Sequence, residues 1–206
     1  MTDRLPHMLR ADAQDNRARI LDAARALFAE RGIDVTMRAV ARRAGVGPAT
    51  LYRRFPTKQM LLDDVFADEL GSCRGIVDDG CADPDPWRGF CSVIERISVL
   101  NSGNQGFVDA FMSADPDADM FAEHRAVLLG MLAELAGRAQ AAGGLRRDFV
   151  IDDLVLVLLA GRALTSTTGS GREAAARRFA ALAIDAFRAS DVNGRLPPAP
   201  RLVQTG

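Results

Sequence analysis

Hydrophobic positions recur at helical spacing along most of the chain. Ile20, Ala24, Leu27 and Phe28 form one apolar stripe that ends before Gly32, which is typical of an amphipathic helix. Alternation of period two never extends beyond a few residues, so we expect no β-sheet. The pattern predicts an all-α fold, with helices over residues 16–31, 37–44, 48–54, 57–73, 86–100, 106–113, 117–142, 151–165 and 171–190.

Charge divides the chain into a basic and an acidic part. Residues 1–58 hold 12 Lys+Arg and 6 Asp+Glu, whereas the rest holds 14 and 21. Between Asp34 and Asp63 there is no carboxylate, but there are several cations: Arg38, Arg42, Arg43, Arg53, Arg54 and Lys58. On charge alone, a solvated helical face explains this stretch as well as a site for a polyanion does.

The local sequence favours the polyanion site. Two short predicted helices are joined by the segment 44–47, Ala-Gly-Val-Gly, which is the pattern of a helix-turn-helix. Gly45 suits a turn that requires positive φ, and Pro48 suits a first helical position. The second helix presents basic residues outward, while Leu51 and Phe55 pack inward. Such a short, exposed, basic helix fits the major groove of B-DNA.

These positions resemble the DNA-binding domain of the tetracycline-repressor (TetR) family over about residues 16–66. The matching string is Thr36-x3-Val40-Ala41-x2-Ala44-Gly45-Val46-x2-Ala49-Thr50-Leu51-Tyr52-x2-Phe55-x-Thr57-Lys58-x2-Leu61. Three positions depart from the family's common pattern. Gly47 replaces a Ser or Thr, Arg54 replaces a His or aromatic residue, and Gln59 replaces a Glu. The base preference is therefore left open.

The resemblance implies a domain plan and a function. We expect a three-helix helix-turn-helix domain over residues 14–58 and a larger helical effector-binding and dimerisation domain over residues 59–190. Residues 1–13 and 191–206 are expected to be disordered tails. The implied function is a sequence-specific transcriptional regulator: a ligand-responsive homodimeric repressor on a palindromic operator, with an apolar or amphipathic effector.

Some of the expected DNA contacts also have a structural explanation. Thr36 serves as a helix cap whether or not it also binds phosphate. Lys58 is the only lysine, and it opposes the dipole of its helix unless it faces a phosphate. Arginines in the groove reach either guanine edges or phosphates. The expected contacts are Thr36, Arg38, Pro48, Ala49, Thr50, Tyr52, Arg53, Arg54 and Lys58.

The last two predicted helices are candidates for the dimer interface. Residues 151–164 are apolar nearly all round, and residues 171–190 carry one apolar stripe. Two such helices can pair with their symmetry mates into a four-helix bundle, although an ordinary core within one chain would look the same. The interface candidates are Leu154, Leu158, Phe179, Ala183 and Phe187.

Aromatic residues and methionines in the acidic part are candidates for an effector pocket. A stripe of this kind is more often ordinary core than pocket, and the sequence favours a core histidine over a ligand contact at His124. Arg162 lies on an apolar face and needs either an interface carboxylate or a ligand anion. The pocket candidates are Trp87, Phe90, Phe107, Phe111, Met112, Phe121, His124, Leu128, Met131 and Arg162.

Other classes of function find little support in the sequence. Cys73, Cys81 and Cys91 have no C-x-x-C spacing, and no signal peptide or long apolar run is present, so we expect free thiols in the cytoplasm rather than a redox or metal site. We find no phosphate loop, nucleophile elbow or metal cluster, and expect no enzyme and no cofactor. A helical enzyme using carboxylates and a ligand-independent architectural DNA binder are the alternatives.

Overall fold

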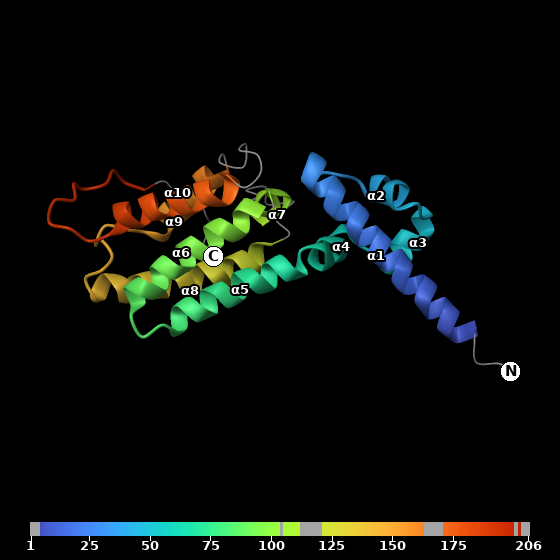
Figure 1. Ribbon diagram of the computed structural model, residues 1–206, viewed down its shortest axis with the longest axis horizontal. Helices are drawn as coiled ribbons and strands as arrows, with labels where there is room; N and C mark the ends of the chain where they lie inside the picture. Colours follow the sequence, from blue (N-terminus) through green and yellow to red (C-terminus); the bar gives the residue numbers. More distant parts are fainter. Residues whose placement is uncertain (1–4, 104, 112–120, 163–170, 200–201, 203–206) are drawn as a thin grey trace. The chain divides into compact units, whose positions relative to one another are not determined.

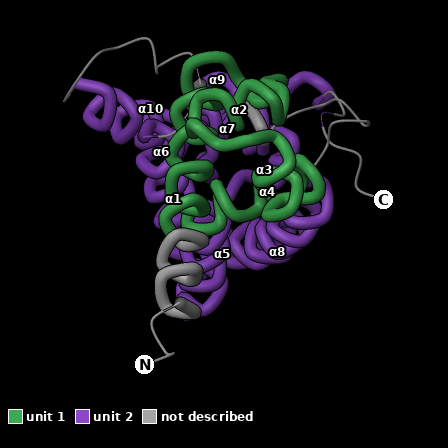
Figure 2. Tube along the Cα trace, turned by 90° about the vertical axis from the view of Figure 1, so that its right-hand side faces the viewer, with its two compact units in different colours: residues 1–68 green, residues 69–206 purple. Residues whose placement is uncertain are grey.

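A computed structural model describes residues 5–103, 105–111, 121–162, 171–199 and 202, the side chains of 5–14, 105, 109, 110 and 162 excepted. Most of the described residues are helical, and one isolated β-bridge joins Leu145 and Arg188. The all-α prediction is therefore confirmed. The chain divides into two compact units, residues 1–68 and 69–206 (Figure 2).

The described residues of the first unit form four helices up to residue 65: α1 (Leu5–Arg31), α2 (Met37–Ala44), α3 (Pro48–Arg54) and α4 (Lys58–Val65). Helix α1 packs against α2 and α4 (Figure 1). The predicted stripe Ile20, Ala24, Leu27 and Phe28 is buried there. Helix α1 begins earlier than we predicted: residues 5–13, which we expected to be disordered, are part of it. Between the first-turn Pro6 and Gly32 no residue breaks the helix.

The predicted continuous helix over residues 57–73 is wrong. Helix α4 ends at Val65, Phe66 has φ −108° and ψ 14°, and α5 (Ala67–Ala82) begins after it. The Phe66 side chain is buried, with its ring 6.0 Å from that of Phe28 in α1. Burial of this ring accompanies the break. The first unit therefore extends to Asp68, beyond the boundary we placed after residue 58.

The second unit is built around α6 (Pro86–Gly103). Helix α6 packs against α7 (Gln105–Phe111), α8 (Ala122–Ala141), α9 (Ile151–Arg162) and α10 (Gly171–Phe187) (Figure 1). Positions 112, 113 and 117–120 of the predicted helices 106–113 and 117–142 lie outside the described residues. So do positions 163–165 of the predicted helix 151–165. The remaining predicted spans match α6 to α10 to within a few residues.

Helices α5 and α6 come into close contact at two glycines, Gly80 and Gly89. A Cβ atom added to Gly89 would overlap the Gly80 carbonyl oxygen, and one added to Gly80 would overlap the Val93 side chain. Because the obstacle at Gly89 is backbone, no side-chain rotation relieves it. This crossing therefore requires glycine and sets the spacing of the two helices.

An aromatic cluster and the described part of the tail pack around the segment between α8 and α9. Phe90, Phe149 and Phe187 lie with ring centroids 5.0 to 6.5 Å apart. Residues 191–199 and 202 form no helix, but they are hydrogen-bonded rather than the disordered segment we expected. The Leu196 N–H donates to the Asp148 carboxylate (3.0 Å), and Arg146 donates to the Gly194 carbonyl (2.7 Å).

The glycine crossing generates a prediction about stability. Gly89→Ala should lower the free energy of unfolding by about 1–3 kcal/mol, because overpacking pushes α5 and α6 apart. Gly75→Ala is the matched control: Gly75 is exposed on α5 with nothing within 4 Å of an added Cβ, and helix propensity should raise stability by about 0.5–1 kcal/mol. Urea unfolding at equal protein concentration measures both. Equal midpoints for the two variants would contradict the close crossing.

Candidate nucleic-acid interface and internal cavity

The turn between α2 and α3 is a tight left-handed turn at Gly45. Its φ of 65° and ψ of 33° suit glycine. The Gly45 N–H donates to the Arg42 carbonyl (3.3 Å) and the Val46 N–H to the Ala41 carbonyl (3.0 Å), which closes the end of α2. The sequence assigned Gly45 this role, and the structure confirms the conformation.

The turn leaves α3 exposed along most of its length. Pro48, Ala49, Tyr52, Arg53 and Arg54 are exposed, whereas Leu51 is fully buried. Tyr52 has 46% of its surface accessible, so its side chain is not part of the buried core. Thr50 is half-buried on the same helix. The expected outward and inward faces of α3 are therefore both confirmed.

Two further helix N-termini carry the remaining candidates. The hydroxyl oxygens of Thr36 and Thr57 accept hydrogen bonds from the Ala39 and Met60 N–H groups, each at 3.2 Å. Thr36 therefore caps α2, as predicted, and Thr57 caps α4 in the same way. Lys58, half-buried, is the first residue of α4. A cation there is unfavourable next to the helix dipole unless an anion binds.

The cations differ in whether the protein neutralises them. Arg43 pairs with Glu30 at 3.0 Å, and Arg17 with Asp64 at 2.8 Å. Within the described part of the chain, other cations make no such pair and no hydrogen bond: Arg38, Arg42, Arg53, Arg54 and Lys58. A surface with this many unneutralised cations suits phosphate.

Sequence reasoning missed two residues of this surface. Arg42 is exposed and is one of the arginines without an ion pair, but we did not include it among the expected DNA contacts. Arg19 of α1 donates through Nη2 to the carbonyls of Ala44 (2.8 Å) and Gly45 (3.4 Å). Arg19 therefore stabilises the turn between α2 and α3. This role could not be predicted from the local sequence, because Arg19 lies 25 residues before Ala44.

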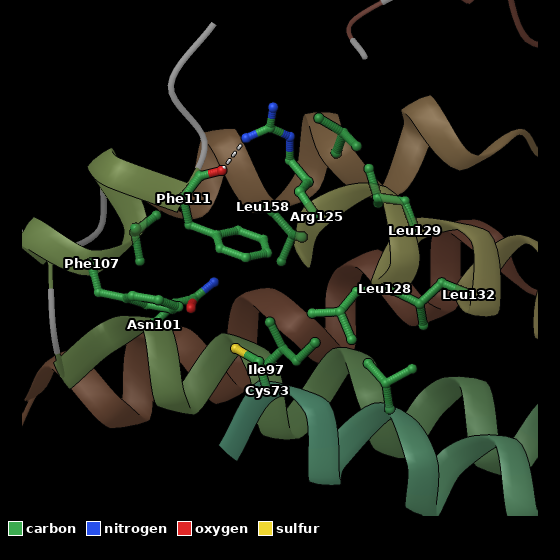
Figure 3. A pocket seen from close by; sticks show the side chains of 13 residues that line it. Cys73, Ile97, Asn101, Phe107, Phe111, Arg125, Leu128, Leu129, Leu132 and Leu158 are labelled. Atoms are coloured by element: carbon green, nitrogen blue, oxygen red, sulfur yellow. Dashed lines mark hydrogen bonds between the residues drawn. The ribbon is translucent and has the colours of Figure 1, made fainter. Parts of the chain in front are cut away.

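A cavity lies inside the second unit, between α5, α6, α7, α8 and α9 (Figure 3). It encloses about 550 Å³ of empty space, part of it open to solvent. The lining is mostly apolar and consists of Cys73, Val77, Ile97, Asn101, Phe107, Val108, Phe111, Arg125, Leu128, Leu129, Leu132, Val155 and Leu158.

The cavity contains three of our pocket candidates, Phe107, Phe111 and Leu128. Met112 and the Arg162 side chain lie outside the described residues. The other candidates do not line it. Trp87 and Phe90 stack on each other in the aromatic cluster, Phe121 packs on Phe107 and Phe111, Met131 is half-buried, and His124 is exposed rather than in the core.

The charged residue of the cavity is Arg125, which sequence reasoning missed. Only 9% of Arg125 is exposed, and its Nη1 donates to the Phe111 carbonyl at 2.7 Å. The buried face of α8 includes Arg125, Leu128, Leu129 and Leu132 and leaves His124 exposed.

Most of the predicted interface residues are core of their own chain. Leu154, Ala183 and Phe187 are buried within their own chain, and the half-buried Leu158 lines the cavity. Phe179 is half-buried and lies against Gly161. The large apolar residues that α9 and α10 expose are instead Leu156 and Leu182. An apolar stripe identifies a buried face but not the chain that covers it.

All three cysteines are free, as predicted. Burial raises the pKa of the Cys73 and Cys91 thiols to about 11 each, with a smaller contribution at Cys73 from the charge of Glu69. These thiols are therefore protonated at neutral pH. Among the described residues, no group of three His, Cys, Asp or Glu side chains is placed to hold a metal ion. No helix in the described ranges is long and apolar enough to cross a membrane.

Known proteins resemble both units. The family model for bacterial regulatory proteins of the TetR family matches residues 20–65, and the model for the C-terminal domain of SbtR-like transcriptional regulators matches residues 85–189. An HTH-type transcriptional regulator of Staphylococcus aureus (strain USA300) is 43% identical over 63 residues, 30% of this chain. The match spans only 34% of that relative's length.

Solved structures extend the likeness to the whole fold. A TetR-family regulator from Shewanella sp. PV-4 is 25% identical with a TM-score of 0.57, over 85% of this chain and 99% of that one. FadR from Bacillus subtilis, solved with stearoyl-CoA, is 16% identical with a TM-score of 0.59, over 81% and 97%. With an exposed helix-turn-helix in the first unit and a matching second unit, the chain belongs to the TetR family of DNA-binding transcriptional regulators.

Proposed function

We propose that the protein is a homodimeric repressor that binds a palindromic operator and releases it when a small molecule enters the cavity. The observation that carries this proposal is the pairing of two sites in one chain. One is an exposed helix-turn-helix with unneutralised cations, and the other is a mostly apolar internal cavity. An architectural DNA binder would need no such cavity. We place the regulator in the cytoplasm, where the bacterial chromosome lies.

The DNA contacts divide into two classes by position. Helix α3 presents Tyr52, Arg53 and Arg54, and we assign Arg53 and Arg54 to the major groove because recognition helices read base edges there. Thr36 and Lys58 begin α2 and α4. We assign them to backbone phosphates, since N–H groups at a helix start favour anions.

Dimerisation follows from the short reading helix. Helix α3 spans only Pro48–Arg54, so it reads a few base pairs, and genomic specificity requires two half-sites related by symmetry. We assign the dimer contact to the exposed apolar side chains of α9 and α10, Leu156 and Leu182. Leu182 is 58% exposed, and apolar exposure of this kind is typical of an interface.

We propose that the segment from α5 through Phe66 to α4 transmits effector binding to the DNA-binding helices. Helix α5 carries Cys73 and Val77 into the cavity lining. It is separated from α4, whose first residue is Lys58, by Phe66 alone. We infer that an effector displaces α5 and that Phe66, held against Phe28, passes this displacement to the first unit. FadR, which was solved with stearoyl-CoA, supports a ligand site in this fold.

Selection of bound DNA from a random pool tests the DNA-reading claim. Enrichment of a palindrome is the expected result, and absence of any enriched sequence would contradict sequence-specific binding. The enriched duplex then serves as the operator in the measurements below.

Lys58 is the sharpest probe of a phosphate contact. Lys58→Ala should weaken binding about equally for all sequences and reduce the salt dependence, d log K/d log[salt], by roughly 1, because one phosphate contact is lost. Arg25→Ala is the control: Arg25 pairs with Asp22 on α1, so its loss should leave the slope nearly unchanged. Fluorescence anisotropy across a salt series measures both. An unchanged slope for Lys58→Ala would show that the phosphate role is wrong.

The dimer face is tested at Leu182. Leu182→Arg should give monomers and weaken operator binding by roughly 100-fold or more, since two linked half-sites bind by avidity. Val127→Arg on α8, at a residue 46% exposed, is the matched control and should stay dimeric. Light scattering gives the mass, and anisotropy gives the affinity. A dimeric Leu182→Arg would move the interface to another face.

Effector control predicts a change in operator affinity. A compound that binds the second unit should weaken operator binding about 5–150-fold, the usual range of allosteric coupling. The measurement is operator affinity with and without saturating compound, after calorimetry has established binding. Equal affinities across several tight binders would end the sensor proposal while leaving DNA binding intact.

A further inference from the structure

We propose that Arg19 of α1 is a positioning residue for DNA reading: it fixes the direction of α3 without contacting DNA itself. The inference rests on the proposed sequence-specific binding through α3. It adds a residue outside α2 and α3 whose loss reduces discrimination between sequences more than it reduces affinity for DNA in general.

The first argument is how little of α3 is anchored in the core. The helix spans only Pro48–Arg54, and Leu51 is its buried side chain. Its N-cap residue, Gly47, makes no side-chain hydrogen bond to the helix, and α3 packs mainly against α2. The direction of α3 therefore depends on the turn that joins it to α2.

The second argument is the set of hydrogen bonds at that turn. The N–H groups of Gly45 and Val46 close the turn on two carbonyls of α2. The carbonyls of Ala44 and Gly45 instead accept from Arg19 Nη2, at 2.8 and 3.4 Å. The last carbonyls of a helix have no partner within it, and the helix dipole favours a cation beside them. Arg19 thus supplies partners that the turn itself does not.

The third argument is that Arg19 starts from a fixed base and fits closely. The adjacent Ile20 is fully buried, and α1 is also tied to α2 by the Arg43–Glu30 pair at 3.0 Å. A Cβ atom added to Gly45 would lie 2.8 Å from Arg19 Nη2, so the guanidinium occupies the space that glycine leaves. Movement of the turn is therefore opposed by a side chain of an anchored helix.

Arg19 also differs from the cations that we assign to DNA. Arg53, Arg54 and Lys58 make no ion pair and no hydrogen bond within the described part of the chain. Arg19 Nη2 carries two N–H groups, and it is directed at two backbone carbonyls. We therefore assign Arg19 to the protein's own backbone and not to phosphate.

The experiment measures discrimination between sequences on the full-length protein. The probes are the operator duplex enriched from the random pool and a scrambled duplex of equal length and composition. Fluorescence anisotropy gives the ratio of the two affinities, at a temperature at which circular dichroism shows each variant folded. Arg19→Met keeps a long side chain of similar helix propensity but removes the donors.

In Arg19→Met the ratio should fall by about 10-fold or more, the equivalent of one lost base contact. The affinity for the scrambled duplex should stay within about 2-fold, because phosphate contacts supply non-specific binding. For the same reason the salt dependence should match that of the unaltered protein. Single base-pair substitutions across the operator should show weaker discrimination at several positions of each half-site, since the whole of α3 changes direction.

Two further variants control the comparison. Arg25→Met removes an exposed arginine of the same helix, which pairs with Asp22, and should leave the ratio intact. Arg19→Lys keeps a charged donor on a different geometry and should give a ratio between those of Arg19→Met and the unaltered protein. If Arg19→Met does not fold, Arg19→Lys carries the test with a smaller expected fall.

Several results would overturn the inference. An unchanged ratio in folded Arg19→Met, even with a lower melting temperature, would leave Arg19 a stabilising role only. A salt slope reduced by roughly 1 on both duplexes would make it a phosphate contact, and a loss confined to one base position would make it a base contact. A ratio for Arg19→Lys no higher than that of Arg19→Met would contradict the hydrogen-bonding role. Equal affinity of the unaltered protein for both duplexes would contradict sequence-specific binding itself, whereas the other results leave it standing.

Discussion

The DNA-reading unit depends on the turn at Gly45. Its left-handed backbone ends α2 and starts α3, so that α3 is exposed while Leu51 stays buried. Any residue with a Cβ would be strained at this φ, and the added atom would lie 2.8 Å from Arg19 Nη2. Arg19 in turn donates to the turn carbonyls. The orientation of the recognition helix is therefore set by one backbone conformation and one side chain of α1.

The parts that sequence predicted well are those determined by neighbouring residues. Thr36, Gly45, Pro48 and Thr57 act within one helical turn of their own position, as caps and turn residues, so a local pattern is sufficient to assign them. The exposed face of α3 followed for the same reason. Arg19 was missed because its partners lie in another helix.

The cavity could not be predicted from the sequence, because its lining depends on how the helices pack against one another. A stripe of Phe and Met shows that a helix face is apolar, but it does not show whether a neighbouring helix or an empty space lies against it. Phe107 lines the cavity while Phe90 fills an aromatic cluster. Arg125 was missed because a buried arginine is rare and its acceptor, the Phe111 carbonyl, is a backbone atom. The break at Phe66 was missed because no glycine or proline marks it.

The break at Phe66 also bears on how such regulators evolve. The two family models match residues 20–65 and 85–189, and α5 falls almost entirely in the interval between them. The part that reads DNA and the part that holds the cavity thus meet at a junction that neither model includes. Recombination at this point would exchange the unit that holds the cavity without altering the helix-turn-helix. Such a division would let a lineage replace one unit while the DNA-binding helices stay the same.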